Sequence, residues 1–232
     1  MKSGLAVAAI FITLCLQATG GAVMVTDADN DFLPTYTGPR NADVDVRSAE
    51  VVFNQAASTF SFSATESGPI GTTPDEEFVF GLNRGRGTER FQSMTPAIGE
   101  DIVFDSVVIL HPNGTGEVAD LLTGGTEALP AGSVKISGNT IGATGVPASL
   151  IPSEGSQPRN FTWDFWPRVG MGSNTQVTDF VPDTTNAVVS ETAVPVALTI
   201  VCKVVSMGFV TVEQSFANPQ TAFLTPAHSN HY

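Results

Sequence analysis

The chain has 232 residues, and its 23 acidic residues outnumber 10 basic ones, which gives a formal net charge of −13. This balance excludes nucleic acid and argues against an anionic membrane surface, because both are bound through cationic protein surfaces. With 22 Gly, 15 Pro and 15 Phe, the composition is not that of a coiled coil, a collagen or a disordered acidic tail. The length fits one domain with additional segments at its ends.

The first residues have the pattern of a secretory signal peptide. Lys2 supplies a positive charge, residues 5–16 are almost entirely apolar, and small residues follow as far as Ala22. The apolar run is shorter than the roughly twenty residues that a spanning helix needs. We therefore expect residues 1–22 to be removed on export, with a retained membrane anchor as the alternative. The exported chain then keeps a single cysteine, Cys202, and has no internal disulfide.

Short strands separated by turn residues begin at about residue 43. In residues 44–53 the alternation of apolar and polar side chains slips by one position near Arg47 and Ser48, which predicts a β-bulge. Residues 59–65 alternate strictly, which is typical of a half-buried antiparallel strand, and we expect them to form a hairpin with the preceding strand.

The later segments continue this pattern. Residues 78–82 and 102–110 predict strands, and the second is apolar on both faces, so we expect it in the middle of its sheet. Asn113-Gly114 and Gly138-Asn139 favour tight hairpin turns, the latter of type II′. Residues 146–153 predict a single helical turn.

Residues 161–166 (FTWDFW) predict a late strand that sends Trp163 and Trp166 to opposite faces. No apolar residues at helical spacing extend beyond a turn or two. Residues 23–184 therefore predict an all-β fold, an antiparallel β-sandwich or jelly roll, as a single domain.

Residues 185–232 predict a C-terminal extension of uncertain structure. Its stretch 193–212 is mostly apolar and β-branched, but Lys203 interrupts it. A Lys at the centre of a spanning helix costs about 2.5 to 3.5 kcal/mol. The alternatives are a membrane or sorting segment, one or two further strands, and an ill-packed extension. Any membrane contact is expected only through residues 193–212.

Few residues fit a catalytic site, so we expect a protein that is not an enzyme. His111 lies at a hairpin turn, and the other two His residues lie near the C-terminus. No Ser or Cys lies in the context of a nucleophile, and no His pair has zinc spacing. A pair of carboxylates can hydrolyse a glycoside, but nothing in the sequence brings a particular pair together.

Asp27, Asp29 and Asp31 place carboxylates at alternate positions, a spacing that lets oxygen ligands converge on calcium. The residues at the sixth and twelfth positions of this segment do not match an EF-hand. Together with Asp43 or Asp45, these residues predict a bound calcium ion that stabilises the edge of the sandwich. Solvated acidic turn residues are the alternative.

Two further groups of residues suggest ligand contacts. Arg84 and Arg86 lie on a Gly-rich loop with Arg90, which is compatible with an anionic ligand or with a structural loop whose arginines pair with carboxylates. Trp166 and Tyr36 are candidate platforms for stacking on a sugar ring, the alternative for Trp166 being a partly buried position at a sheet edge.

The motifs of residues 25–184 occur in the following order: DADNDFLPTYTGPRNADVDVRSAEVVF, FVFGLNRGRGTERF, IVFDSVVILHPNGTG, LPAGSVKISGNTIGATGVPASLIPS and FTWDFWPRVG with TQVTDFVPD. This order resembles an all-β module of bacterial exported and surface proteins, often found with exosortase-sorting tails or calcium-binding repeats. The opening is similar, more distantly, to sandwich modules of the DOMON and family-nine carbohydrate-binding type. The resemblance implies a sandwich fold and an extracellular or surface location, and it brings no catalytic residue. Val194-Pro195-Val196 stands where a sorting tail has Pro-Glu-Pro.

Two classes of function follow from these patterns. The first is an exported, non-catalytic surface or matrix protein that acts by interaction with other surface proteins. The alternative is a carbohydrate-binding module that contacts polysaccharide and is stabilised by calcium.

Overall fold

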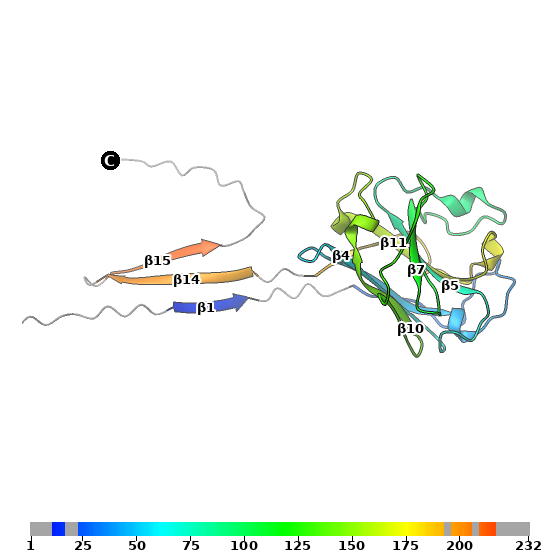
Figure 1. The fold of residues 1–232 in the computed structure, drawn as a ribbon, viewed down its shortest axis with the longest axis horizontal. Helices are drawn as coiled ribbons and strands as arrows, with labels where there is room; N and C mark the ends of the chain where they lie inside the picture. Colours follow the sequence, from blue (N-terminus) through cyan, green and yellow to red (C-terminus); the bar gives the residue numbers. More distant parts are fainter. Residues whose placement is uncertain (1–10, 17–22, 193–195, 206–208, 217–232) are drawn as a thin grey trace, which may run out of the picture. The chain divides into compact units, whose positions relative to one another are not determined.

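The computed structural model describes residues 11–16, 23–192, 196–205 and 209–216 (Figure 1). These residues divide into two compact units, one made of residues 20–192 and the other of the segments before and after them.

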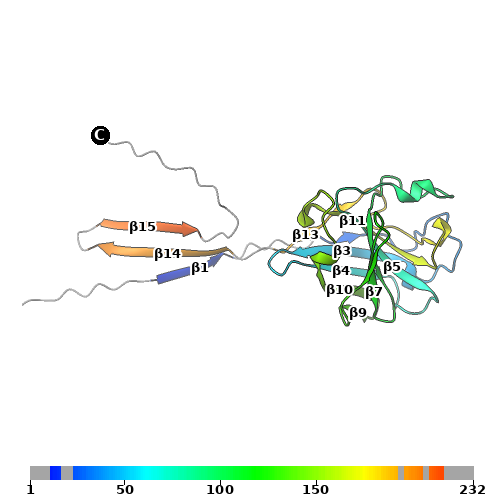
Figure 2. The same ribbon diagram turned by 45° about the horizontal axis from the view of Figure 1, so that its top comes forward.

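Residues 23–192 form two six-stranded sheets that pack face to face, which confirms the predicted all-β sandwich. The first sheet has the order β13-β3-β4-β10-β9, with β2 also paired to β3 (Figure 2). Its strands are β2 (Val25–Thr26), β3 (Val46–Asn54), β4 (Thr59–Glu66), β9 (Val134–Ser137), β10 (Thr140–Pro147) and β13 (Ser190–Glu191). The second sheet has the order β12-β11-β5-β6-β7-β8. Its strands are β5 (Glu76–Asn83), β6 (Ser106–Leu110), β7 (Gly116–Asp120), β8 (Thr126–Ala128), β11 (Thr162–Val169) and β12 (Ala187–Val188).

The helical elements of the described residues are short 3-10 turns between strands. They are η1 (Ala42–Val44), η2 (Arg90–Ser93), η3 (Ala148–Leu150), η4 (Pro158–Asn160) and η5 (Asn174–Gln176). η3 lies within the segment where the sequence predicts a single helical turn.

The core between the sheets is largely aromatic. Alternating residues of β4, β5 and β11 point into it because side chains of a strand alternate between its two faces. Phe80 lies at its centre, with ring centroids 4.6 Å from Phe165 and 5.2 Å from Phe62. Aromatic pairs at these separations add to the free energy gained from burying their area.

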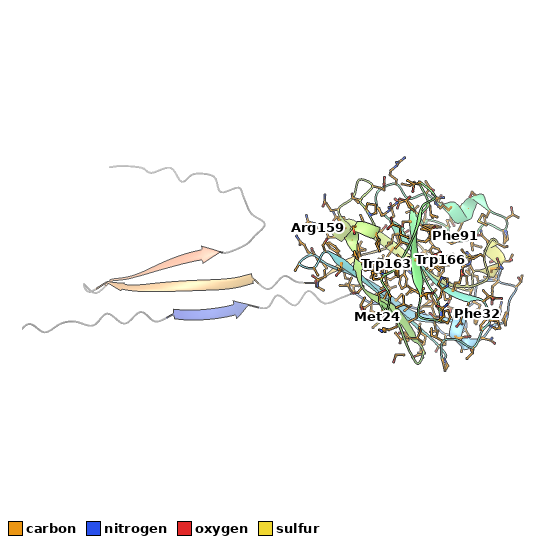
Figure 3. All side chains as sticks on the ribbon, in the orientation of Figure 1. Met24, Phe32, Phe91, Arg159, Trp163 and Trp166 are labelled. Atoms are coloured by element: carbon orange, nitrogen blue, oxygen red, sulfur yellow. The ribbon has the colours of Figure 1, made fainter. Side chains whose placement is uncertain are left out.

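A second apolar layer covers the outer face of the second sheet. Trp166 leaves β11 on the side opposite to Trp163, as predicted, and packs under Phe91, Phe104 and Phe180 (Figure 3). These phenylalanines come from connecting segments that fold back over the sheet.

Most local predictions are confirmed. β3 and β4 form a hairpin whose register shifts between Val46 and Ser48, where the bulge is predicted. β9 and β10 pair across the Gly138 turn, where φ is +63°. The strand predicted over 102–110 is confined to Ser106–Leu110, and β6 does lie inside its sheet. Ile102 and Phe104 instead join the outer apolar layer.

The sandwich continues beyond the predicted boundary at residue 184. β12 pairs with β11 of the second sheet, and β13 pairs in parallel with β3 of the first. Residues 187–191 thus contribute a short strand to each sheet, so the domain extends to about Thr192.

The other unit contains β1 (Phe11–Leu16), β14 (Val196–Val205) and β15 (Phe209–Phe216), which pair in the order β1-β14-β15. The described part of the apolar stretch 193–212 therefore has the strand structure that was one of its predicted alternatives. Among the described residues, no helix has the length and apolar character needed to span a membrane. Of the segment predicted as a signal peptide, residues 1–10 and 17–22 lie outside the described residues.

Replacement of Phe80 by Ala tests the aromatic core. Phe80 is fully buried and contacts aromatic rings from both sheets, so we expect Phe80→Ala to lower the free energy of unfolding by about 3 to 5 kcal/mol. Urea denaturation measures this change. Val188→Ala, at a side chain that is 61% exposed, should change it by no more than about 0.5 kcal/mol. Similar losses in both variants would contradict the assigned core.

Candidate metal centre

Five aspartates from distant parts of the chain meet at one edge of the sandwich. Asp27 and Asp31 lie in the segment after β2, and Asp45 lies between η1 and β3. Asp179 and Asp183 lie in the segment between η5 and β12. We call these five residues the acidic cluster.

The acidic cluster contains two overlapping triplets of carboxylates. One consists of Asp27, Asp179 and Asp183, and the other of Asp31, Asp45 and Asp179, with the oxygens of each triplet within 4.8 Å of one another. Two ligands of one calcium ion lie at most about 5 Å apart, since Ca–O distances are about 2.3–2.6 Å. Each triplet therefore has the spacing of ligands on one cation, and Asp179 belongs to both.

Backbone hydrogen bonds hold this arrangement in place. The amide of Asn30 donates to both oxygens of Asp45, at 3.0 and 3.1 Å, with Asn30 in the left-handed region at φ +62°. The amide of Asp27 donates to the carbonyl of Arg47 at 2.9 Å. The amide of Phe180 donates to Oδ1 of Asp179 at 2.9 Å. The segment after β2 is thus bound to β3, with Asp27 and Asp31 facing the carboxylates of the other segments.

Two more acidic side chains, Asp164 of β11 and Glu66 at the end of β4, are fully buried next to the cluster. None of their four carboxylate oxygens has a hydrogen-bond partner. A buried polar group without a partner is costly, and a buried unpaired charge is much more so. These two carboxyl groups therefore require a proton or a cation beside them.

Electrostatic repulsion within the site is strong. Burial, followed by the charges of Asp183, Asp179 and Asp27, raises the pKa of Asp164 well above its usual value. Burial, followed by the charges of Asp179 and Asp45, does the same to the pKa of Glu66.

Within the cluster itself, burial raises the pKa of Asp27 to about 6. Burial and then the charge of Asp27 raise the pKa of Asp179 to about 9. None of the ion pairs among the described residues involves the cluster or its two buried neighbours. The site is thus rich in negative charge and has no basic side chain to balance it.

The predicted calcium ligands are only partly brought together. Asp27 and Asp31 belong to the cluster, but Asp29 does not. Asp29 instead forms an ion pair with Arg47 at 3.1 Å and accepts a hydrogen bond from the hydroxyl of Ser67 at 2.7 Å. Of the two residues predicted as additional ligands, Asp45 lies in the cluster.

Asp43, the other predicted additional ligand, binds a different part of the chain. Its carboxylate accepts hydrogen bonds from the amides and hydroxyls of Thr72 and Thr73. Burial raises its pKa, but these hydrogen bonds and one with Glu76 outweigh burial and lower it. Burial and the hydrogen bond to Asp43 raise the pKa of Glu76 to about 8.

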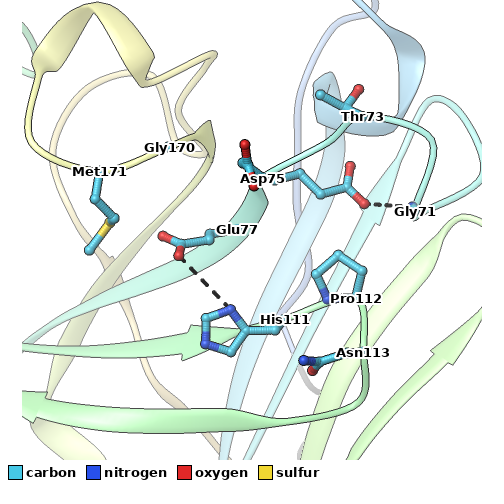
Figure 4. A pocket seen from close by; sticks show the side chains of 10 residues that line it. Gly71, Thr73, Asp75, Glu77, His111, Pro112, Asn113, Gly170 and Met171 are labelled. Atoms are coloured by element: carbon cyan, nitrogen blue, oxygen red, sulfur yellow. Dashed lines mark hydrogen bonds and ion pairs between the residues drawn. The ribbon is translucent and has the colours of Figure 1, made fainter.

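Glu76 also lines a cavity of about 580 Å³ at the rim of the sandwich (Figure 4). The cavity has Asp75 and Glu77 in its wall, and His111 lies 4.0 Å from Glu77. No Phe, Tyr or Trp side chain lines it. The cavity therefore lacks the aromatic platform on which a sugar ring stacks.

Sequence reasoning missed Asp164, Asp179, Asp183 and Glu66. The available signal was a charged residue in an apolar context, such as Asp164 between Trp163 and Phe165. Such a residue indicates a buried carboxylate, but it does not indicate which other residues surround it.

The arginines of the Gly-rich loop have structural partners. Arg84 is fully buried, and its Nε donates to Oδ1 of Asp105 at 2.7 Å while Nη1 lies 3.2 Å from Oδ2 of Asp120. The amide of Arg86 donates to Asp105, and its exposed guanidinium lies 3.7 Å from Glu154. The anionic-ligand interpretation is therefore wrong for Arg84, whose donors are already used, and the structural alternative accounts for both residues.

The two aromatic side chains proposed as sugar platforms are not exposed. Trp166 is 2% exposed because Phe91, Phe104 and Phe180 cover it. Tyr36 is 5% exposed, lies parallel to Phe32, and donates from its hydroxyl to the carbonyl of Pro39 at 3.0 Å. The prediction of exposed rings is wrong for both residues.

No protein-family model, curated protein or solved structure matches the chain. The site is therefore interpreted from its own geometry.

Replacement of Arg84 by Met tests the structural role of the loop. The change leaves Asp105, which is fully buried, without its cation, and breaking a buried pair in this way costs about 3 to 5 kcal/mol. Equilibrium denaturation in urea measures the loss. Arg86→Met, at the exposed pair, should cost no more than about 1 kcal/mol. A stable Arg84→Met protein would overturn the assignment of Arg84 to the fold.

Proposed function

We propose that the protein is an exported, non-catalytic β-sandwich that acts by interaction at the cell surface or in the surrounding matrix, and that calcium bound by the acidic cluster stabilises it. The calcium proposal rests on the converging carboxylates of the acidic cluster. It rests also on Asp164 and Glu66, whose buried carboxylate oxygens have no hydrogen-bond partners.

The ligand chemistry favours calcium over other metals. All five residues of the cluster offer carboxylate oxygens, and neither triplet includes His or Cys. Zinc and copper sites usually include nitrogen or sulfur ligands, whereas oxygen ligands suit calcium and magnesium. Calcium accepts six to eight oxygens in irregular geometry, while magnesium demands a regular octahedron and retains waters. Carboxylates from separate loops therefore suit calcium better.

Export would expose such a site to extracellular calcium. The first 22 residues have the signal-peptide pattern, and extracellular calcium-binding modules work at dissociation constants of about 10⁻⁴ to 10⁻³ M. A protein with these properties gains stability after it reaches a calcium-rich environment. The net charge of −13 keeps the folded protein soluble and opposes self-association.

An interaction role follows from the absence of a recognisable catalytic arrangement in the sequence. Carbohydrate binding receives less support, because Trp166 and Tyr36 are buried and the rim cavity has no aromatic wall. Other surface proteins are therefore the partners that we favour over polysaccharide.

Calcium should raise the melting temperature of metal-stripped protein. One ion at about 100 times its Kd adds about 2.7 kcal/mol, which corresponds to roughly 5–10 °C for a domain of this size. Asp179→Asn should abolish most of this shift. In EDTA it should be no less stable than the wild type, because the pKa of Asp179 is about 9 and the buried carboxyl that Asn replaces is already uncharged at neutral pH. Differential scanning calorimetry measures both effects.

Asp29→Asn is the matched control, because Asp29 lies beside the cluster but pairs with Arg47 instead. It should retain the full response to calcium. Magnesium at the same concentration should give a smaller shift. An unchanged melting temperature in millimolar calcium, or an equal loss in Asp29→Asn and Asp179→Asn, would refute the proposed calcium site.

Export is tested by the mass of the protein recovered from its host. We expect a protein outside the cytoplasm that lacks the residues up to Gly20 or Ala22. Because β1 (Phe11–Leu16) lies in the removed segment, β14 would then lose one of the two strands with which it pairs and keep β15. A full-length mass in the cytosolic fraction would contradict export.

A further inference from the structure

We infer that the acidic cluster binds two calcium ions side by side and that the carboxylate of Asp179 bridges them. This inference rests on the proposed calcium site and adds the number of ions and the ligands of each.

Each triplet has its own fully buried carboxylate. Asp27, Asp179 and Asp183 are the residues whose charges act on Asp164. We call this group site A.

Asp31, Asp45 and Asp179 form the other triplet. The charges that act most strongly on Glu66 are those of Asp179 and Asp45. We call this triplet with Glu66 site B. The two triplets share only Asp179.

A single cation does not satisfy this arrangement. Placed in site A, it leaves Glu66 buried beside Asp45 without a compensating charge. Placed in site B, it leaves Asp164 in the same condition next to Asp27 and Asp183. An unpaired buried charge costs several kcal/mol, so with one site occupied the remaining buried carboxyl must take up either a proton or a second cation.

Asp179 is suited to a bridging role. Its Oδ2 is buried and has no hydrogen-bond partner, and its Oδ1 accepts a single hydrogen bond, from the amide of Phe180. A carboxylate has about four lone-pair positions, so this side chain has capacity for two cations while it retains the bond that orients it.

Both sites are accessible to ions from solution. Asp183 of site A and Asp31 of site B are exposed, whereas Asp45 and Asp179 are buried. Each triplet therefore has one carboxylate that solvent reaches, and each exposed aspartate can be replaced without disturbing the core.

Protons are the alternative means of neutralising the site, and counting bound ions distinguishes the two. We propose native mass spectrometry of the metal-stripped full chain in increasing calcium, together with equilibrium dialysis. The expected result is two calcium ions per chain. Asp183→Asn and Asp31→Asn should each leave one tightly bound ion, with the affinity for the other lowered at least tenfold. Asp179→Asn should weaken both, and Asp29→Asn should still bind two.

Lanthanides test the distance between the ions without any substitution. Protein loaded with an equimolar mixture of terbium and europium should show energy transfer from terbium to europium, since ions that share one carboxylate lie within a few ångströms. Circular dichroism verifies that each variant retains the β-sheet signal.

The outcomes separate the two proposals. One calcium ion per chain, or two ions without energy transfer, overturns the bridged pair and leaves the proposed calcium-stabilised function intact. No bound calcium overturns both. Loss of both ions in Asp31→Asn as well as in Asp183→Asn, with folding preserved, overturns the assignment of these residues to separate sites.

Discussion

Repulsion among carboxylates at one edge of the sandwich is the constraint on which the arrangement of the domain depends. Glu66 belongs to the first sheet, and Asp45 directly precedes β3 of that sheet. Asp164 belongs to the second sheet, and Asp179 lies in a connecting segment. Burying these carboxyl groups together at the edge is unfavourable, and the aromatic core offsets that cost. A cation reverses the sign of the electrostatic contribution, because carboxylates that repel one another become ligands of the same ion. The hydrophobic core and the charged edge therefore stabilise the closed sandwich together only when the edge is neutralised.

Much of the fold could be predicted because the alternation of apolar and polar side chains along a strand indicates which of its faces is buried. The bulge near Ser48, the Gly138 turn and the opposite directions of Trp163 and Trp166 all follow from local patterns. Local patterns gave less information about the outer apolar layer. Residues 102–104 are as apolar as a strand, but Ile102 and Phe104 pack over the second sheet because Phe91 and Trp166 supply a second apolar surface there.

The candidate site was only partly predictable for a related reason. Spacing places Asp27 and Asp31 together, but more than 130 residues separate them from Asp179 along the chain. The segment around Asp179 lies beside β11, and the amide of Leu33 donates to the carbonyl of Thr178, so only tertiary pairing brings these groups together. Asp29 has the sequence spacing of a calcium ligand, but its carboxylate forms an ion pair with Arg47 of β3 and does not join the acidic cluster. Trp166 and Tyr36 looked like surface rings because nothing in their local sequence indicates the segments that cover them.

The two ends of the sandwich domain lie next to each other. The amide of Val23 donates to the hydroxyl of Ser190 at 2.8 Å, and both β2 and β13 pair with β3. Polypeptide that enters at residue 23 and leaves after Thr192 therefore passes through almost the same point. Once residues 1–22 are removed, as proposed for the exported protein, the chain begins at Val23 beside Ser190. A pull on the segment after Thr192 would then enter the domain through the two-residue strand β13 alone.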